Sequence, residues 1–163
     1  MNDSKAGHIA LVCIVCLLLD QGSKWWASDN LVAWQMTSYL GDMVRIGYTE
    51  NLGVFLSVGA GFSPEQRMVL FIGVVGLFLL ALLSYMVKSR DLSKLQLTSL
   101  SLIFAGGIGN LLDRIFNHGA VIDFINLGIG SIRTGIFNIA DVVILIGAMM
   151  IILCTPFQSA QLK

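Results

Sequence analysis

The chain has 163 residues, of which 56% are hydrophobic and 12% are charged, and ten Lys or Arg balance ten Asp or Glu. A soluble domain carries about 25% charged residues, and the mean hydropathy here is +0.81. The composition excludes an ordinary soluble domain and predicts an integral membrane protein of a single domain, residues 1–163. A balanced charge without a run of Lys or Arg gives no support to nucleic-acid binding.

A helix needs about 20 mostly apolar residues to cross a bilayer. We therefore expect an all-α membrane protein with four transmembrane helices, over approximately residues 7–27, 67–87, 95–115 and 138–158. Lys5 and the apolar run that follows resemble a signal peptide, but no small-x-small cleavage site comes next. We predict a retained first helix. Asp20 and Lys24 then lie one turn apart, near a membrane surface that Lys24 reaches by snorkelling.

The segment between the first two spans is too long and too polar for a turn. Residues 43–49 alternate with period two, which predicts a strand, and we expect a small extracytoplasmic β-cradle over approximately residues 31–64. Lys88, Arg90 and Lys94 form the densest cationic cluster and place their loop in the cytoplasm. Four spans then put both termini on the cytoplasmic side.

The third span contains a small-xxx-small face, Ala105 and Gly109, which permits close helix packing. Asn110 and Asp113 in the same span need polar partners inside the bundle. Asp113 and Arg114 are adjacent, and we interpret them as a neutralising pair that anchors the helix. The cysteines are interpreted as small apolar residues of membrane helices, because no second Cys/His pair completes a metal site.

Two carboxylates, Asp123 and Asp141, are flanked by apolar residues. An ionisable side chain in a membrane costs roughly 2.5–3.5 kcal/mol at a helix centre, so it marks a functional site. Two carboxylates in close contact share a proton, which is the arrangement of an aspartic protease. Arg133 lies between them in sequence and is a candidate counter-ion. From the residues alone, a proton-coupled transporter is an open alternative.

Five blocks occur in order between residues 20 and 141: Asp20-Gln21-x-x-Lys24, Asn51-x-Gly53, Gly109-Asn110-x-x-Asp113-Arg114, Val121-Ile122-Asp123-Phe124 and Phe137-Asn138-x-Ala140-Asp141. Together with four expected spans, they resemble the bacterial lipoprotein signal peptidase (signal peptidase II) family. The resemblance implies a multi-pass aspartic endopeptidase of the bacterial inner membrane with its active site facing outward. Its substrates would be diacylglyceryl-modified prolipoproteins, cleaved just before the lipidated cysteine.

The resemblance also assigns roles to residues. It implies catalysis by Asp123 and Asp141, without a metal or other cofactor, in a monomer whose partners are lipid-modified prolipoproteins and membrane lipid. Residues that would bind substrate or support the dyad are Asn51, Gly53, Asn110, Arg114 and Asn138. Polar residues with a structural role would be Asp20, Lys24 and Asp113.

The chain departs from the family pattern in its outer loop. The family commonly has Asn-x-Gly-Ala-Ala-Phe, whereas bulkier Val54, Phe55 and Leu56 follow Gly53 here, and residues 126–135 are rich in glycine. A divergent paralogue with a narrower substrate range is therefore an alternative. A non-proteolytic transporter is a second one, but it would need ionisable residues across the bilayer depth, and here they gather at one side.

Overall fold

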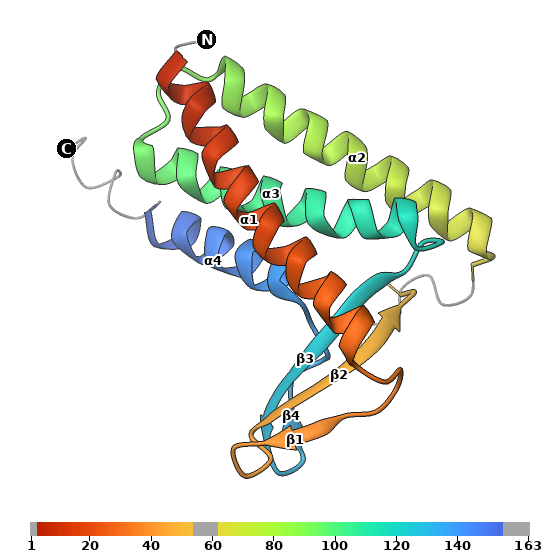
Figure 1. Ribbon diagram of the computed structural model, residues 1–163. Coiled ribbons are helices and arrows are strands. Elements are labelled where there is room, and N and C mark those ends of the chain that lie inside the picture. The colour runs from red at the N-terminus through yellow and green to blue at the C-terminus, as the bar shows by residue number, and fades with distance from the viewer. Residues whose placement is uncertain (1–2, 54–61, 155–163) are drawn as a thin grey trace.

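The computed structural model describes residues 3–53 and 62–154. Its helices are α1 (Asp3–Asn30), α2 (Pro64–Lys88), α3 (Lys94–Phe116) and α4 (Ile139–Cys154). Its strands are β1 (Thr37–Tyr39), β2 (Val44–Asn51), β3 (Val121–Ile129) and β4 (Ile132–Arg133). The helices form a bundle and the strands form a sheet that projects from one end of it (Figure 1).

In the described ranges, three helices (α1 to α3) are long and apolar enough to cross a membrane. They contain 28, 25 and 23 residues. At 1.5 Å per residue these helices are about 42, 38 and 35 Å long, against about 30 Å of hydrocarbon. The 16 residues of α4 form a shorter apolar helix. The part of the expected fourth span after residue 154 lies outside the described residues, so a fourth span stays a prediction.

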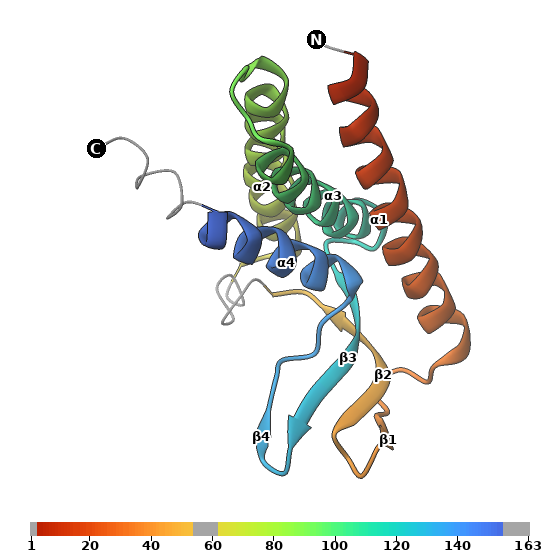
Figure 2. The same ribbon diagram turned by 90° about the vertical axis from the view of Figure 1, so that its left-hand side faces the viewer.

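Helix α3 is the centre of the bundle and packs against α1, α2 and α4 (Figure 2). Its start is fixed by a capping box, in which the Ser93 side chain accepts from the Gln96 N–H and the Gln96 side chain accepts from the Ser93 N–H. Small residues let α4 approach α3 closely: Gly106 lies against the backbone of Ala140, and Gly147 lies against the backbone of Ser99. Of the face predicted in the third span, Ala105 is buried, and a Cβ added at Gly109 would lie 2.5 Å from Asp20 Oδ2 on α1 and 3.4 Å from Ala140 Cβ on α4.

The sheet is antiparallel with the order β1-β2-β3-β4. The strand predicted over residues 43–49 is confirmed as β2, but the expected cradle over 31–64 was incomplete, because β3 and β4 come from residues 121–133. The first four residues of β3 are buried. A strand buried on both faces reads as a continuous apolar run, which periodicity cannot distinguish from a helix. Residues 54–61, including the altered outer loop, lie outside the described residues.

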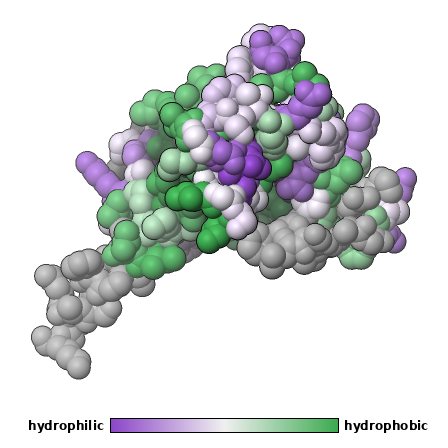
Figure 3. Space-filling view, turned by 90° about the horizontal axis from the view of Figure 1, so that it is seen from below, coloured by the Kyte–Doolittle hydropathy of each residue, from purple (hydrophilic) through white to green (hydrophobic). Residues whose placement is uncertain are grey.

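The far end of the sheet is apolar and exposed. Leu40 is 75% exposed, Ile129 is 73% exposed and Ile132 is 84% exposed. In the view from the sheet side, hydrophobic and hydrophilic side chains lie next to one another on the surface (Figure 3). Exposed apolar residues of this size mark a contact surface for a membrane or a protein. The expected position of the sheet against a membrane surface accounts for them.

Replacing Gly106 by alanine should separate α3 from α4. An added Cβ would lie 2.5 Å from the Ala140 carbonyl oxygen and 2.7 Å from Ile144 Cγ1. We expect Gly106→Ala to lower the free energy of unfolding by about 1–3 kcal/mol, the usual cost of overpacking. Gly76→Ala is the matched control, because nothing lies within 4 Å of its added Cβ. Thermal unfolding in detergent measures both variants, and equal stabilities would contradict the close packing.

Candidate active site

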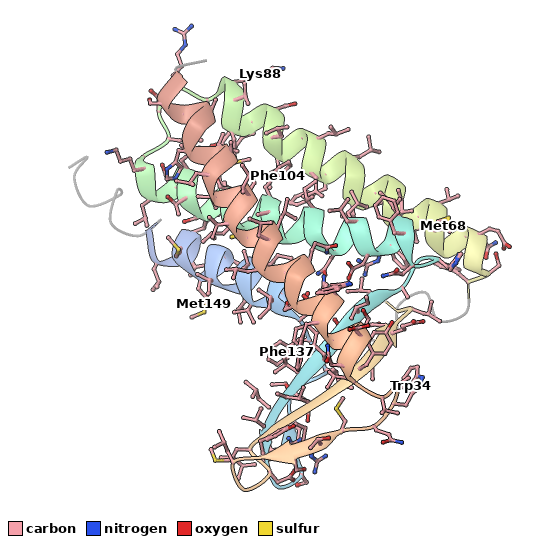
Figure 4. All side chains as sticks on the ribbon, in the orientation of Figure 1. Trp34, Met68, Lys88, Phe104, Phe137 and Met149 are labelled. Atoms are coloured by element: carbon pink, nitrogen blue, oxygen red, sulfur yellow. The ribbon has the colours of Figure 1, made fainter. Side chains whose placement is uncertain are left out.

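Asp123 and Asp141 line the same cavity, of about 530 Å³, where the sheet meets the bundle. Asp123 lies on β3, and Asp141 lies in the first turn of α4. Phe137, another lining residue, marks this junction in Figure 4. The two carboxylates are 18 positions apart in sequence, and the strand, its return segment and the helix start bring them to one site.

Asp123 is 3% exposed and is held by two side-chain amides. Asn51 Nδ2 donates to Asp123 Oδ2 at 3.0 Å, and Asn138 Nδ2 donates to Oδ1 at 2.7 Å. Burial away from water raises the pKa of Asp123 to about 6; the two amides oppose this shift and the charge of Asp141 adds to it. The carboxyl group therefore keeps its proton at a higher pH than an exposed aspartate does.

The start of α4 determines the position of Asp141. The Asp141 N–H donates to Asn138 Oδ1 at 3.0 Å, and the Asn138 N–H donates to Asp141 Oδ2 at 3.2 Å. This reciprocal pair is a capping box made of Asn and Asp. The other oxygen, Oδ1, accepts from Asn110 Nδ2 at 2.8 Å. A helix N-terminus stabilises a negative charge, so the local sequence places a carboxylate here and fixes its orientation.

A buried ammonium group lies behind the two carboxylates. Lys24 is 2% exposed. Its Nζ lies 2.9 Å from Asp20 Oδ2, 2.9 Å from Asp113 Oδ2 and 3.0 Å from Asn110 Oδ1. Two predictions were wrong: Lys24 does not snorkel, because its ammonium group is buried against Asp113 and Asn110 of α3, and Asp113 pairs with Lys24 instead of Arg114. The predicted pair of Asp20 and Lys24 is confirmed.

This ion cluster also holds the backbone beside each candidate catalytic residue. Asp20 Oδ1 accepts from the N–H of Ala140 at 2.8 Å, one residue before Asp141. Asp113 Oδ2 accepts from the N–H of Ile122 at 3.1 Å, one residue before Asp123. Lys24 thus joins two carboxylates that position the two chain segments of the site.

The cluster orients the Asn110 amide as well. Its Oδ1 accepts from Lys24 Nζ at 3.0 Å and from Asn138 Nδ2 at 3.1 Å. Because both donors lie on the oxygen side of the Asn110 amide, its Nδ2 group faces Asp141. Asn138 is fully buried and has contacts with Asn110, Asp123 and Asp141, so one side chain connects both carboxylates.

The candidate counter-ion Arg133 was the wrong choice. Its guanidinium donates to the Asp42 carbonyl at 2.8 Å and to Asn126 Oδ1 at 2.6 Å, within the sheet. Besides Lys24 behind the carboxylates, the cation at the dyad is Arg114, which lines the cavity and interacts electrostatically with Asp123 and Asp141. Its Nη1 donates to the Asn110 carbonyl at 3.1 Å.

The other residues expected at the site are also there. Asn51, Gly53 and Asn110 line the cavity. The Gly53 N–H donates to Asn51 Oδ1 at 3.0 Å, which turns the Asn51 Nδ2 group toward Asp123. Among the described residues no group of three or more His, Cys, Asp or Glu side chains is arranged to hold a metal ion.

Sequence reasoning missed two kinds of residue. Gln21 Nε2 donates to Asp20 Oδ2 and to Asp113 Oδ1, both at 3.0 Å, and its place in the first motif was a usable signal. The Thr49 hydroxyl donates to the Asp123 carbonyl at 2.9 Å. The apolar wall of the cavity was also missed, because its residues do not differ from their apolar surroundings: Val121, Ile136, Phe137, Ile144, Leu145 and Ala148.

Removing the buried ammonium should destabilise the protein strongly. Lys24→Met leaves Asp20 and Asp113 buried without a cation, and we expect the free energy of unfolding to fall by about 3–5 kcal/mol. Arg45→Gln is the control, because its pair with Asp42 is 36% and 39% exposed and such a pair contributes up to about 1 kcal/mol. Denaturation in detergent compares the variants. Similar losses would show that the buried cluster has no special structural role.

Comparisons with known proteins agree along most of the chain. The family model for signal peptidase (SPase) II matches residues 12–157. The lipoprotein signal peptidase of Treponema denticola is 32% identical over 146 residues, covering 86% of this chain and 84% of the relative. That of Chlorobium phaeobacteroides is 35% identical over 159 residues, covering 90% of this chain and 91% of the relative.

The fold is similar to that of a solved structure. A bacterial membrane enzyme superposes with a TM-score of 0.83 at 26% sequence identity, covering 96% of this chain and 92% of the other. The family match includes Asp123, Asp141, the Lys24 cluster and all the described strands. The chain therefore belongs to the signal peptidase II family.

Proposed function

We propose that this chain is an aspartic endopeptidase that removes the signal peptide from diacylglyceryl-modified prolipoproteins, just before the lipidated cysteine. Its membership of the signal peptidase II family supports a protease that acts on prolipoproteins. The observation that carries the aspartic mechanism is the shared cavity, in which Asn138 contacts both Asp123 and Asp141.

In this mechanism Asp141 is the general base and Asp123 is the general acid. Asp141, whose two oxygens are oriented by Asn110 and by the Asn138 N–H, takes a proton from the attacking water. The water oxygen bonds to the scissile carbonyl carbon while Asp123 donates its proton to the carbonyl oxygen. When the tetrahedral intermediate collapses, the C–N bond breaks, the leaving amine takes the proton from Asp141, and one hydroxyl of the intermediate returns its proton to Asp123, which restores both groups. No metal or organic cofactor takes part.

The supporting residues have matching roles. Asn51, Asn110 and Asn138 hold the carboxylates in place, and Gly53 orients Asn51. Arg114 lies in the cavity wall, where its charge can stabilise the intermediate. The apolar wall from α4 suits the lipid and the apolar signal peptide of such a substrate.

We place the protein in the bacterial inner membrane as a monomer with four spans, α4 being the fourth. The loop of Lys88, Arg90 and Lys94 supports cytoplasmic termini, because short cationic loops stay in the cytoplasm. The dyad lies at the other end of the bundle and so faces outward. A lipidated substrate then enters laterally from the outer leaflet, where water is also available.

Each carboxylate should be essential for cleavage. We expect Asp123→Asn and Asp141→Asn each to reduce kcat by at least about 10²–10⁴-fold, the range for a lost general acid or base. The double variant should be no worse than either single one, because the two groups act as a unit. The assay measures cleavage of a diacylglyceryl-modified precursor by purified protein.

Asp42→Asn is the matched control, since Asp42 lies in the sheet outside the cavity lining. We expect it to keep nearly full activity, and thermal unfolding establishes that all variants fold. Turnover by either folded dyad variant at the rate of the unmodified enzyme would refute the aspartic mechanism.

The pH dependence should report the proton on Asp123. Because the acid acts in its protonated form and its pKa is about 6, kcat/KM should fall as the pH rises through about 6. Asn51→Ala removes a donor that favours the ionised form of Asp123 and so raises its pKa. The decline of kcat/KM should therefore move to higher pH. Initial rates across the pH range test this. If kcat/KM of Asn51→Ala declines at the same pH as that of the unmodified enzyme, the assignment of Asp123 as the acid is contradicted.

A further inference from the structure

A second cavity, of about 730 Å³, lies at the end of the bundle opposite the sheet. Its lining residues come from the start of α1, the end of α2, the start of α3 and the loop between α2 and α3, and these segments lie at one end of the bundle (Figure 1). In Figure 4, Lys88 lies at this end of α2, away from Trp34 in the segment between α1 and β1. Among the described side chains that line the cavity none is a carboxylate, and the basic ones are Lys5, His8, Lys88, Arg90 and Lys94.

No ion pair joins these cations to a carboxylate of the described part of the chain. Among the side chains that the structure describes, the ion pairs involve Lys24, Arg45 and Arg133 and none of the lining cations. Lys5 Nζ donates to the Ser89 carbonyl at 2.5 Å, and His8 Nε2 lies 2.9 Å from Thr98 Oγ1. Four like charges at one cavity repel one another, so binding of an anion there would be favourable.

The start of α3 adds to this preference for an anion. The N-terminus of a helix is the positive end of its dipole, yet the first turn of α3 contains Lys94 and no acidic residue. The first turn of α2, in contrast, contains Glu65. The N–H groups of the first helical residues have no acceptor within the helix. In α3 the Ser93 side chain accepts from one of them, that of Gln96.

The position of the cavity indicates the kind of anion. Lys5 and Lys24 are 19 positions apart on α1, which is about 28 Å along the helix, close to the hydrocarbon thickness of about 30 Å. The cavity therefore lies at the headgroup level of the leaflet opposite the dyad. Apolar residues also line it, and one of them, Leu97, packs in the buried cluster with Ile9 and Met86.

We propose that this cavity binds the phosphate headgroup of an anionic glycerophospholipid. The cations and the start of α3 would contact the phosphate, and the acyl chains would lie along the exposed apolar surface of α2. Basic pockets between membrane helices bind such headgroups. This site is separate from the proposed catalytic cavity, and its test does not depend on proteolysis.

The experiment titrates the purified full-length protein in neutral detergent. Phosphatidylglycerol is compared with phosphatidylcholine of the same acyl chains and with inorganic phosphate, by native mass spectrometry and by the unfolding temperature. Each Lys or Arg near a membrane surface contributes about fivefold in affinity for an anionic lipid. We therefore expect selective binding of phosphatidylglycerol, and about a hundredfold loss in the variant Lys88→Gln/Arg90→Gln/Lys94→Gln.

A charge swap provides the matched control for that variant. Lys94→Leu/Leu95→Lys keeps the composition and the number of cations in the loop, but moves one ammonium by about 100° around α3, away from the cavity lining. We expect about fivefold weaker binding of phosphatidylglycerol. Arg45→Gln removes one charge in the sheet and should bind the lipid as the unmodified protein does.

The possible results separate the alternatives. Equal affinity for the two lipids, or a charge swap without effect, would show that the cations only orient the protein in the membrane. Inorganic phosphate that displaces phosphatidylglycerol at equal concentration would show a site for free anions. Either result would overturn the proposal, whereas headgroup selectivity that the swap weakens would support it.

Discussion

The site depends on one buried ion cluster. The Lys24 ammonium lies between Asp20 and Asp113, and each of these carboxylates holds the backbone beside one candidate catalytic aspartate. Such a cluster is costly to bury and more costly to break, because a charge left alone in an apolar interior has no solvent to stabilise it. It therefore acts as a fixed point that keeps α1, α3, β3 and α4 in one arrangement.

Next to this cluster, the side chains of three asparagines hold Asp123 and Asp141 in defined orientations. Asn110 and Asn138 connect the cluster to Asp141 and Asp123, and Asn51 brings in the end of β2. Amides suit this task because each has both donor and acceptor atoms and carries no charge. They can bind a carboxylate without neutralising it, so the site remains able to exchange protons.

The sequence predicted much of this site, because its residues are unusual for a membrane helix. Asp123, Asp141, Asn110 and Asn138 are polar groups in apolar surroundings, and the cost of burying them indicates function. The depth of Lys24 was not predictable, since an i, i+4 pair looks the same at a surface and inside a bundle. Its burial depends on how closely α3 and α4 approach α1, which is a tertiary feature.

The sheet was harder to predict than the helices. β2 alternates in hydrophobicity and was found, whereas the start of β3 is buried on both sides and gives no period of two. The partner of Arg133 depends on this missed strand, because Asn126 and Arg133 meet across β3 and β4. The part of the apolar cavity wall that α4 supplies has no sequence signal, because Ile144, Leu145 and Ala148 do not differ from the other apolar residues of that helix.

The attachment of Asn51 at the end of β2 has a consequence for how the enzyme responds to its surroundings. The Asn51 amide contacts Asp123, and β2 pairs with β3 through Thr49 and Asp123. A displacement of this strand end lengthens the amide contact, and the neighbouring acid then holds its proton more tightly. Strain that moves the end of β2 would therefore change the acidity of the Asp123 carboxyl group on the neighbouring strand.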